Sequence, residues 1–239
     1  MPDPAQARLE AALPAALERL RATPGVYVAL WCGSAARGEA TAHSDLDFHA
    51  LVGGDRRWRS NFTVRGVPVE VFHNPARQIR ALLAAGDAAT VAMFAQGRPA
   101  LPHPELDALC AEARARYAAG PAPRLPAEAE RFALIEELMD ARAQADAGDP
   151  VHAVTVLKAL SRQLMPLLYA RHGWWGVKRE HWARDLGERA PDLAAELRAL
   201  LVAPDLAARQ AAFETLVRRV TGDLTYRQVP PEPQEAGDL

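Results

Sequence analysis

The sequence predicts a mixed α/β domain with a short mixed β-sheet, followed by an all-α helical bundle. Apolar runs of strand length recur within residues 26–73, and the segments between the proline-rich stretch 120–126 and residue 221 have helical periodicity. We therefore assign residues 1–119 to the first domain, 120–126 to a linker and 127–228 to the bundle. The Pro- and Glu-rich segment 229–239 is expected to be a disordered tail.

Composition narrows the class of protein. A chain of 239 residues can bury a sizeable core, and a formal net charge of −2 gives no overall basic field for nucleic acid. Cys32 and Cys110 both lie in apolar segments, so we expect small buried thiols and neither a disulfide framework nor a zinc site. No apolar run is long enough to span a bilayer. We expect a cytoplasmic protein with no membrane or nucleic-acid partner.

The first domain is expected to begin with an amphipathic helix over residues 5–21, which Pro14 either starts or kinks. Residues 55–61 are polar and Arg-rich and favour a loop or a fraying hairpin arm, whereas 90–101 is apolar and ambiguous. Strands are predicted at 26–32, 46–52, 62–65 and 67–73, and helices at 76–85 and 104–117. In the bundle, helices are predicted at 127–147, 151–172, 174–190, 191–201 and 206–221.

The most informative segment begins where the first strand runs into Gly33-Ser34. A residue without a side chain lets the backbone come close to a ligand, and the next residues can open a helix. The first N–H groups of a helix have no internal partner, and the helix dipole adds positive potential there. This arrangement is suited to a phosphate group.

Two carboxylates follow at the start of the second strand. Because strand side chains alternate between faces, Asp45 and Asp47 point the same way, while Leu46 and Phe48 point into the core. Two carboxylates on one face repel each other unless a cation lies between them, and hard oxygen ligands beside a phosphate favour Mg²⁺. The pattern predicts a metal–triphosphate site. The alternative is a turn and a solvated edge strand whose two aspartates merely face water.

This pattern resembles the signature of the nucleotidyltransferases related to DNA polymerase β. In that superfamily a strand leads into Gly-Ser, and about ten residues later Asp-x-Asp begins the next strand. All its parts are present here: Gly33-Ser34, Arg37-Gly38, Ser44 and Asp45-Leu46-Asp47.

The resemblance implies roles for these residues. Asp45 and Asp47 would hold Mg²⁺, with two ions expected, and ATP would be the nucleotide donor. The nucleotide-binding residues would be Gly33, Ser34, Arg37 and Ser44.

Glu70 is the candidate third acid. It is a single carboxylate in the apolar strand 67–73, and burying it without a cation, a partner or water would be costly. The resemblance implies that a third carboxylate joins the Asp pair from this strand, either as general base or as metal ligand. The alternative is an outward-facing residue on an edge strand, which Pro68 would mark.

A weaker resemblance covers residues 157–182. A helix followed by a glycine turn, Trp174-Trp175 and Lys178 is similar to the helical domain of small-molecule nucleotidyltransferases, including antibiotic-modifying adenylyltransferases. Lys178, one of only two lysines, would reach a phosphate as a flexible point charge, or it is an ordinary surface lysine. The two tryptophans either wall an acceptor pocket or anchor the turn against the bundle.

Three functions are compatible with these features. The first is Mg²⁺-dependent transfer of AMP from ATP to a hydroxyl of a small molecule, such as an aminoglycoside- or lincosamide-type antibiotic. The second is a protein-modifying, AMPylating enzyme of the antitoxin type, against which the long helical region counts. The third is a non-catalytic nucleotide-binding protein, which would not need all three acids. We favour the first. The sequence leaves the acceptor and the oligomeric state open.

Overall fold

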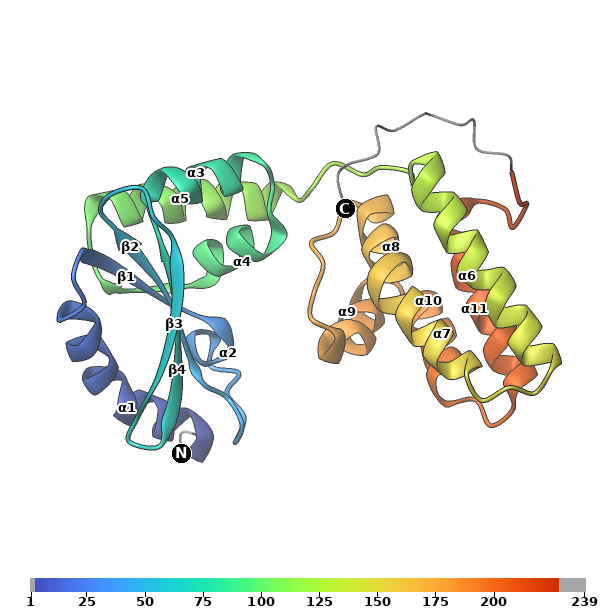
Figure 1. Ribbon diagram of the computed structural model, residues 1–239, viewed down its shortest axis with the longest axis horizontal. Helices are drawn as coiled ribbons and strands as arrows, with labels where there is room; N and C mark the ends of the chain where they lie inside the picture. Colours follow the sequence, from blue (N-terminus) through green and yellow to red (C-terminus); the bar gives the residue numbers. More distant parts are fainter. Residues whose placement is uncertain (1–2, 228–239) are drawn as a thin grey trace, which may run out of the picture. The chain divides into compact units, whose positions relative to one another are not determined.

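The computed structural model describes residues 3–227, which form two compact units, one ending at Gly120 and the other starting at Pro121 (Figure 1). The units are described separately below. The tail predicted at 229–239 lies outside the described residues. Over the described part of the chain, no helix is both long and apolar enough to cross a membrane.

The first unit is built on a mixed five-stranded sheet with strand order β3-β4-β2-β1-β5. Only the central pair, β2 and β4, is parallel, and the other neighbouring pairs are antiparallel. The strands are β1 (Val26–Cys32), β2 (Leu46–Val52), β3 (Trp58–Val64), β4 (Val67–Asn74) and β5 (Arg98–Leu101). The α/β fold class and the mixed sheet expected from the sequence are thus confirmed.

Helices cover both faces of this sheet. Helix α1 (Pro4–Arg21) buries Leu9, Leu20 and two alanines against the side chains of Trp31, Phe48 and their neighbours on one face. On the opposite face, α4 (Ala88–Gln96) places Met93 against His49 of β2. Helices α3 (Ala76–Ala84) and α5 (Pro104–Ala119) pack beside α4 (Figure 1).

The structure settles two ambiguities of the sequence. Helix α1 runs through Pro14, whose exposed ring faces away from the buried leucines, so the helix does not begin there. The apolar segment 90–101 divides into the end of α4 and the short strand β5, with Gly97 between them.

Of the two alternatives for residues 55–61, the hairpin arm is correct from Trp58 onward, because β3 begins there, and the loop is confined to the residues before it. Strands β3 and β4 form a hairpin whose two-residue turn, Arg65-Gly66, has φ values of 50° and 75°. Such a turn matches the twist of antiparallel strands and aligns Val64 with Val67, and the pairing continues back to Trp58. A polar segment on an edge strand can keep this ladder because most of its side chains face solvent.

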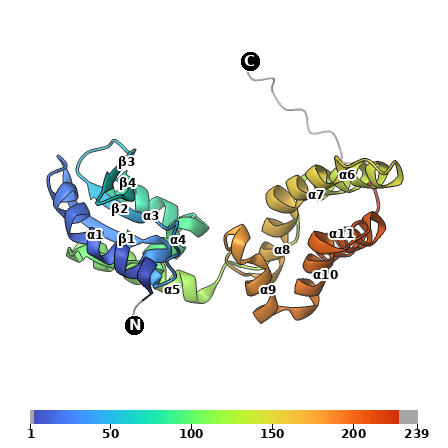
Figure 2. The same ribbon diagram turned by 90° about the horizontal axis from the view of Figure 1, so that it is seen from below.

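The second unit is all helical, as predicted. Its helices α10 and α11 lie side by side in both views (Figures 1 and 2). The buried core includes Leu138, Leu168 and Phe213. The helices are α6 (Glu128–Asp146), α7 (His152–Ala159), α8 (Met165–His172), α9 (Trp182–Arg189), α10 (Pro191–Val202) and α11 (Leu206–Thr221).

The long helix predicted at 151–172 is interrupted by a π-helical segment, Leu160–Leu164, between α7 and α8. Pro166 lies two residues after this segment and has no N–H to donate to the preceding turn, so a local change of helical winding fits this position.

The helix predicted from 174 is wrong in its first part. Helix α8 ends at Gly173 in the left-handed conformation, residues 174–178 have no regular secondary structure, and α9 begins only at Trp182.

Candidate functional site

The glycine that opens the motif is pressed against a motif carboxylate. Gly33 begins the five-residue helix α2 (Gly33–Arg37) directly after β1 and has φ of 78°. A Cβ atom at this position would lie 2.2 Å from Asp47 Oδ2. Only glycine allows both this backbone conformation and this approach. The turn and the start of β2 are therefore one compact structure.

The strand register aligns Asp47 with Glu70. Asp47 pairs with Cys32 of β1 on one side and with Glu70 of β4 on the other, and Glu70 pairs with Asn61 of β3. Directly opposite residues on neighbouring strands share a face, so these four side chains form a row across the sheet. Leu46 and Val69, one position earlier, lie buried on the face that α1 covers. The row thus points to the other face.

Asp45 lies just before β2 and is partly buried like Asp47. The negative charge of Asp45 acts on the buried thiol of Cys32. Burial raises the pKa of that thiol, and the Asp47 carboxylate raises it further, with a smaller contribution from Asp45. The two aspartates thus place negative potential at the end of β1. Cys32 itself is a buried thiol, as predicted, and so is Cys110.

Glu70 is bound by an arginine that the sequence pattern did not single out. Nε of Arg59 donates to Glu70 Oε1 at 2.6 Å, and Nη2 of Arg59 donates to the same oxygen. The Arg59 guanidinium also lies over the ring of Phe72, 4.8 Å from its centroid. Among the described residues, no three His, Cys, Asp or Glu side chains are gathered closely enough to hold a metal ion. The strand register thus aligns two of the three acids, Asp47 and Glu70, and Arg59 holds Glu70.

The two motif serines lie together. Ser34 Oγ and Ser44 Oγ are 3.2 Å apart, and Ser44 Oγ also accepts a hydrogen bond of 2.9 Å from the backbone N–H of Thr41. Arg8 of α1 donates from its guanidinium to the backbone oxygen of Ser44 at 2.8 Å. No sequence signal identifies this contact, because the two residues are brought together only by the packing of α1. Arg37 is paired with Glu39 at 2.9 Å.

Lys178 and the tryptophan pair belong to the helical unit. Trp174 stacks on His172 at 4.3 Å between ring centroids and contacts the hydrophobic core, which favours the anchoring interpretation for this residue. Trp175 is half-buried, and Lys178 is exposed just before a 3₁₀ turn. These residues are not among those that β1, β2 and β4 bring together, so a phosphate-binding role for Lys178 stays a prediction.

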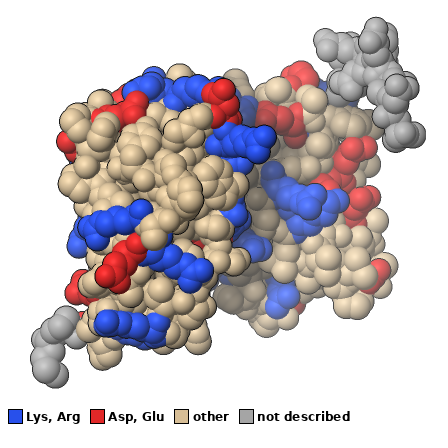
Figure 3. All heavy atoms as spheres, turned by 60° about the vertical axis from the view of Figure 1, so that its left-hand side comes forward, with Lys and Arg blue, Asp and Glu red and all other residues tan. Residues whose placement is uncertain are grey.

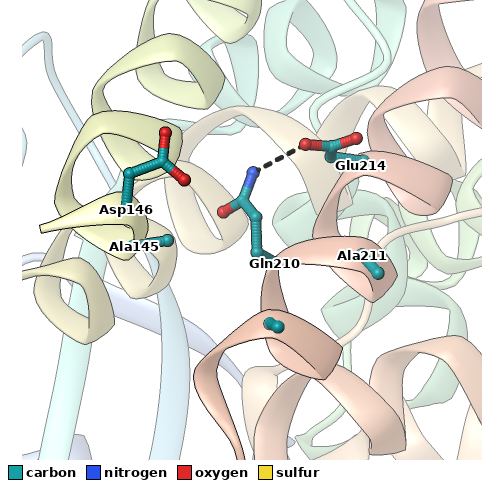
Figure 4. Close-up of a pocket in the computed structure, with 6 residues that line it drawn as sticks. Ala145, Asp146, Gln210, Ala211 and Glu214 are labelled. Carbon is teal, nitrogen blue, oxygen red and sulfur yellow. Dashed lines mark hydrogen bonds between the residues drawn. The ribbon is translucent and has the colours of Figure 1, made fainter. Parts of the chain in front are cut away.

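A cavity of about 260 Å³ lies between α6 and α11 of the helical unit (Figure 4). Gln210 donates to Glu214 Oε1 at 3.1 Å, and Arg142 donates to the same oxygen at 2.6 Å. Gln210 and Glu214 of this cavity are therefore already hydrogen-bonded within the protein. None of the residues predicted for the nucleotide or metal site lines the cavity. The lining residues are Ala145, Asp146, Ala207, Gln210, Ala211 and Glu214.

Charged side chains of both signs are interspersed on the face shown in Figure 3. This mixture agrees with the nearly balanced composition of the chain, with 28 Lys and Arg against 30 Asp and Glu.

No protein-family model and no curated protein matches the chain. Among solved structures, it is similar to a nucleotidyltransferase-like protein from Exiguobacterium sibiricum, with 14% sequence identity and a TM-score of 0.49. The likeness covers 87% of this chain and 74% of that one. Function is therefore inferred from the site residues themselves.

Proposed function

We propose that this protein is a Mg²⁺-dependent nucleotidyltransferase that transfers AMP from ATP to a hydroxyl group of a small molecule, such as an aminoglycoside- or lincosamide-type antibiotic. One observation carries the proposal. Gly33 approaches Asp47 so closely that no side chain fits between them, and Asp47 lies in register with Glu70. This combination joins a glycine turn to carboxylates on two neighbouring strands, and carboxylate oxygens are the ligands that a Mg²⁺ site requires.

The residues present fit a magnesium ion. Asp45 and Asp47 supply hard carboxylate oxygens, and the absence of a side chain on Gly33 lets the Asp47 carboxylate lie directly against the turn. Glu70 would complete the set once it is released from Arg59. Bound Mg²⁺ would offset the charge of the triphosphate and lower the pKa of the acceptor hydroxyl.

The chain's own residues then have separate roles in the transfer. Ser34 Oγ would donate a hydrogen bond to a phosphate oxygen, and Glu70 would accept the proton of the acceptor hydroxyl. The hydroxyl oxygen forms a bond to the α-phosphorus as the bond between that phosphorus and the bridging oxygen to the β-phosphate breaks. Pyrophosphate leaves with that oxygen. The products are the adenylylated acceptor and pyrophosphate, and Glu70 carries the proton of the acceptor hydroxyl.

A screen tests the proposal. The protein is incubated with Mg²⁺ and each of the four α-³²P-labelled nucleoside triphosphates, in the presence of pools of antibiotics and hydroxylated metabolites. We expect label from ATP to appear in one small-molecule product, and none with Asp47→Asn. Label transfer that is equal in the two proteins, or transfer only onto protein, would contradict the proposal.

The serine of the turn is expected to contribute to nucleotide affinity. Ser34→Ala removes one hydrogen bond to a charged phosphate, worth roughly 1.5–3 kcal/mol. We therefore expect the Kd for Mg²⁺-ATP to rise by about 10- to 100-fold, with activity reduced and not abolished. Calorimetric titration measures this. Ser60→Ala is the matched control, because Ser60 pairs with Val71 on the face that α1 covers. Equal Kd values for the two variants would argue against the phosphate contact.

The two roles left open for Glu70 have different signatures. If Glu70 is the general base, Glu70→Gln should leave Mg²⁺-nucleotide affinity nearly unchanged and lower turnover by roughly 10²–10⁴-fold. The loss should then shrink at high pH, where the acceptor hydroxyl ionises more readily unaided. If Glu70 is mainly a metal ligand, raised Mg²⁺ or added Mn²⁺ should restore part of the rate. We favour the base, and turnover measured across pH and metal concentration decides; full activity throughout would exclude both roles.

A further inference from the structure

We infer that Arg59 is a positioning residue that occupies Glu70 as a built-in counter-ion in the metal-free protein and must release it when a divalent cation binds. This inference rests on the proposed function, because it concerns the third acid of the same site. It assigns a role to a residue of β3 that the motif does not include.

The strand register explains why these two residues meet. Arg59 pairs with Phe72 across the hairpin, and Glu70 lies two residues before Phe72, so both point to the same face of the sheet. Diagonal neighbours of this kind are within reach of a long side chain. Both Nε and Nη2 of Arg59 donate to the same oxygen, Glu70 Oε1.

The exposure of the two groups differs. The side chain of Glu70 is 24% exposed, whereas that of Arg59 is 61% exposed on the outermost strand. When Arg59 lets go of Glu70, its guanidinium is therefore exposed to solvent at little cost in free energy. The guanidinium can still contact the Phe72 ring. Glu70, in contrast, stays in the row beside Asp47. Arg59 is thus the partner that can move, and Glu70 is the partner that stays.

A cation and Arg59 would compete for one carboxylate. Without a metal, the guanidinium neutralises Glu70 next to Asp47, which limits repulsion between acids in the row. A divalent cation that takes Glu70 as a ligand has to displace this hydrogen-bonded charge. The apparent affinity of the protein for the cation is then lower than the affinity of the three acids alone.

Binding of Mn²⁺ alone, followed by the electron paramagnetic resonance of the free ion, tests the inference without any turnover. We expect Arg59→Gln to bind Mn²⁺ roughly fivefold more tightly than the wild type, the upper range for loss of one partly exposed ion pair. Arg57→Gln is the matched control, since it removes the same charge from an exposed position in the preceding loop. The control should change the affinity by less than about twofold at 0.15 M salt.

A double-mutant cycle separates a contact with Glu70 from a general effect of charge. In the Glu70→Gln background, Arg59→Gln should no longer alter Mn²⁺ affinity, because the carboxylate that both groups share is gone. Equal tightening in both backgrounds, no tightening in either, or an equal effect of Arg57→Gln would overturn the inference. Circular dichroism melting confirms that the variants are folded.

The same titration distinguishes this inference from the proposed function. Asp47→Asn should weaken Mn²⁺ binding strongly. If it does so while Arg59→Gln has no effect, the metal site stands and the role of Arg59 is wrong. If Asp47→Asn leaves Mn²⁺ binding unchanged, the proposed metal site itself is wrong, and the inference falls with it.

Discussion

Replacing Asp47 with asparagine is expected to lower nucleotidyl transfer by roughly 10²–10³-fold or more, the usual cost of removing a group that stabilises developing charge. Asparagine keeps the size of the side chain beside Gly33 but removes the negative charge that would hold Mg²⁺. The fold should persist, and Asp45→Asn should behave in the same way. The measurement is label transfer under saturating Mg²⁺ and ATP.

Asp55→Asn provides the matched control for this loss. Asp55 is 85% exposed and paired with Arg77 at the surface, so the same chemical change there should leave transfer within about twofold of the wild type. Wild-type turnover in Asp47→Asn, or an equal loss in Asp55→Asn, would contradict the assignment of Asp47.

The second large effect is expected at Gly33. Gly33→Ala places a Cβ atom 2.2 Å from Asp47 Oδ2, so the aspartate and the turn must move apart. We expect loss of measurable Mg²⁺-ATP binding and of transfer, and Gly33→Val should be at least as severe. The strain of a positive φ adds a stability cost of about 1–2 kcal/mol.

Gly38→Ala separates the effect of the strained backbone conformation from the effect of the clash with Asp47. Gly38 has φ of 77°, almost the same as Gly33, but a Cβ atom there would have no atom within 4 Å. Both variants should lose stability from the strained φ in denaturant unfolding, and Gly33→Ala should lose more because of its clash with Asp47, whereas only Gly33→Ala should lose ATP binding. If both variants keep ATP binding, the close approach of Gly33 to Asp47 has no part in nucleotide recognition.

The sequence predicted the central strands because their local signals agree. Val26–Cys32 is a continuous apolar run, and Leu46–Val52 is apolar apart from Asp47 and His49; glycines or turn residues flank both. Such runs are typical of strands that are buried on both faces. Local signals alone therefore suffice to place Gly33, Asp45 and Asp47 at strand ends. The pairing of Asp47 with Glu70, in contrast, joins parallel strands with β3 between them in the chain, and the local pattern does not determine such a register.

Arg59 was missed, although a signal for it exists. The two-residue turn at Arg65-Gly66 fixes the register of the hairpin, and counting back from Val64 and Val67 pairs Arg59 with Phe72. That count depends on extending β3 to Trp58, whereas the polar composition of the segment left a loop and a fraying hairpin arm as alternatives.

The error at Trp174 has a different cause. The end of α8 before Gly173 agrees with the prediction, but the next helix does not begin at Trp174, because Trp174 stacks back on His172 and residues 174–178 have no regular secondary structure.

The most direct test of the central claim is to follow the two ends of the ATP molecule separately. The protein is incubated with Mg²⁺, an acceptor identified in the screen and ATP labelled with ³²P at either the α- or the γ-phosphate. We predict that α-label enters the small-molecule product, that γ-label appears only in pyrophosphate, and that Asp47→Asn does neither. Entry of γ-label into the product would mean phosphoryl transfer and would contradict the account.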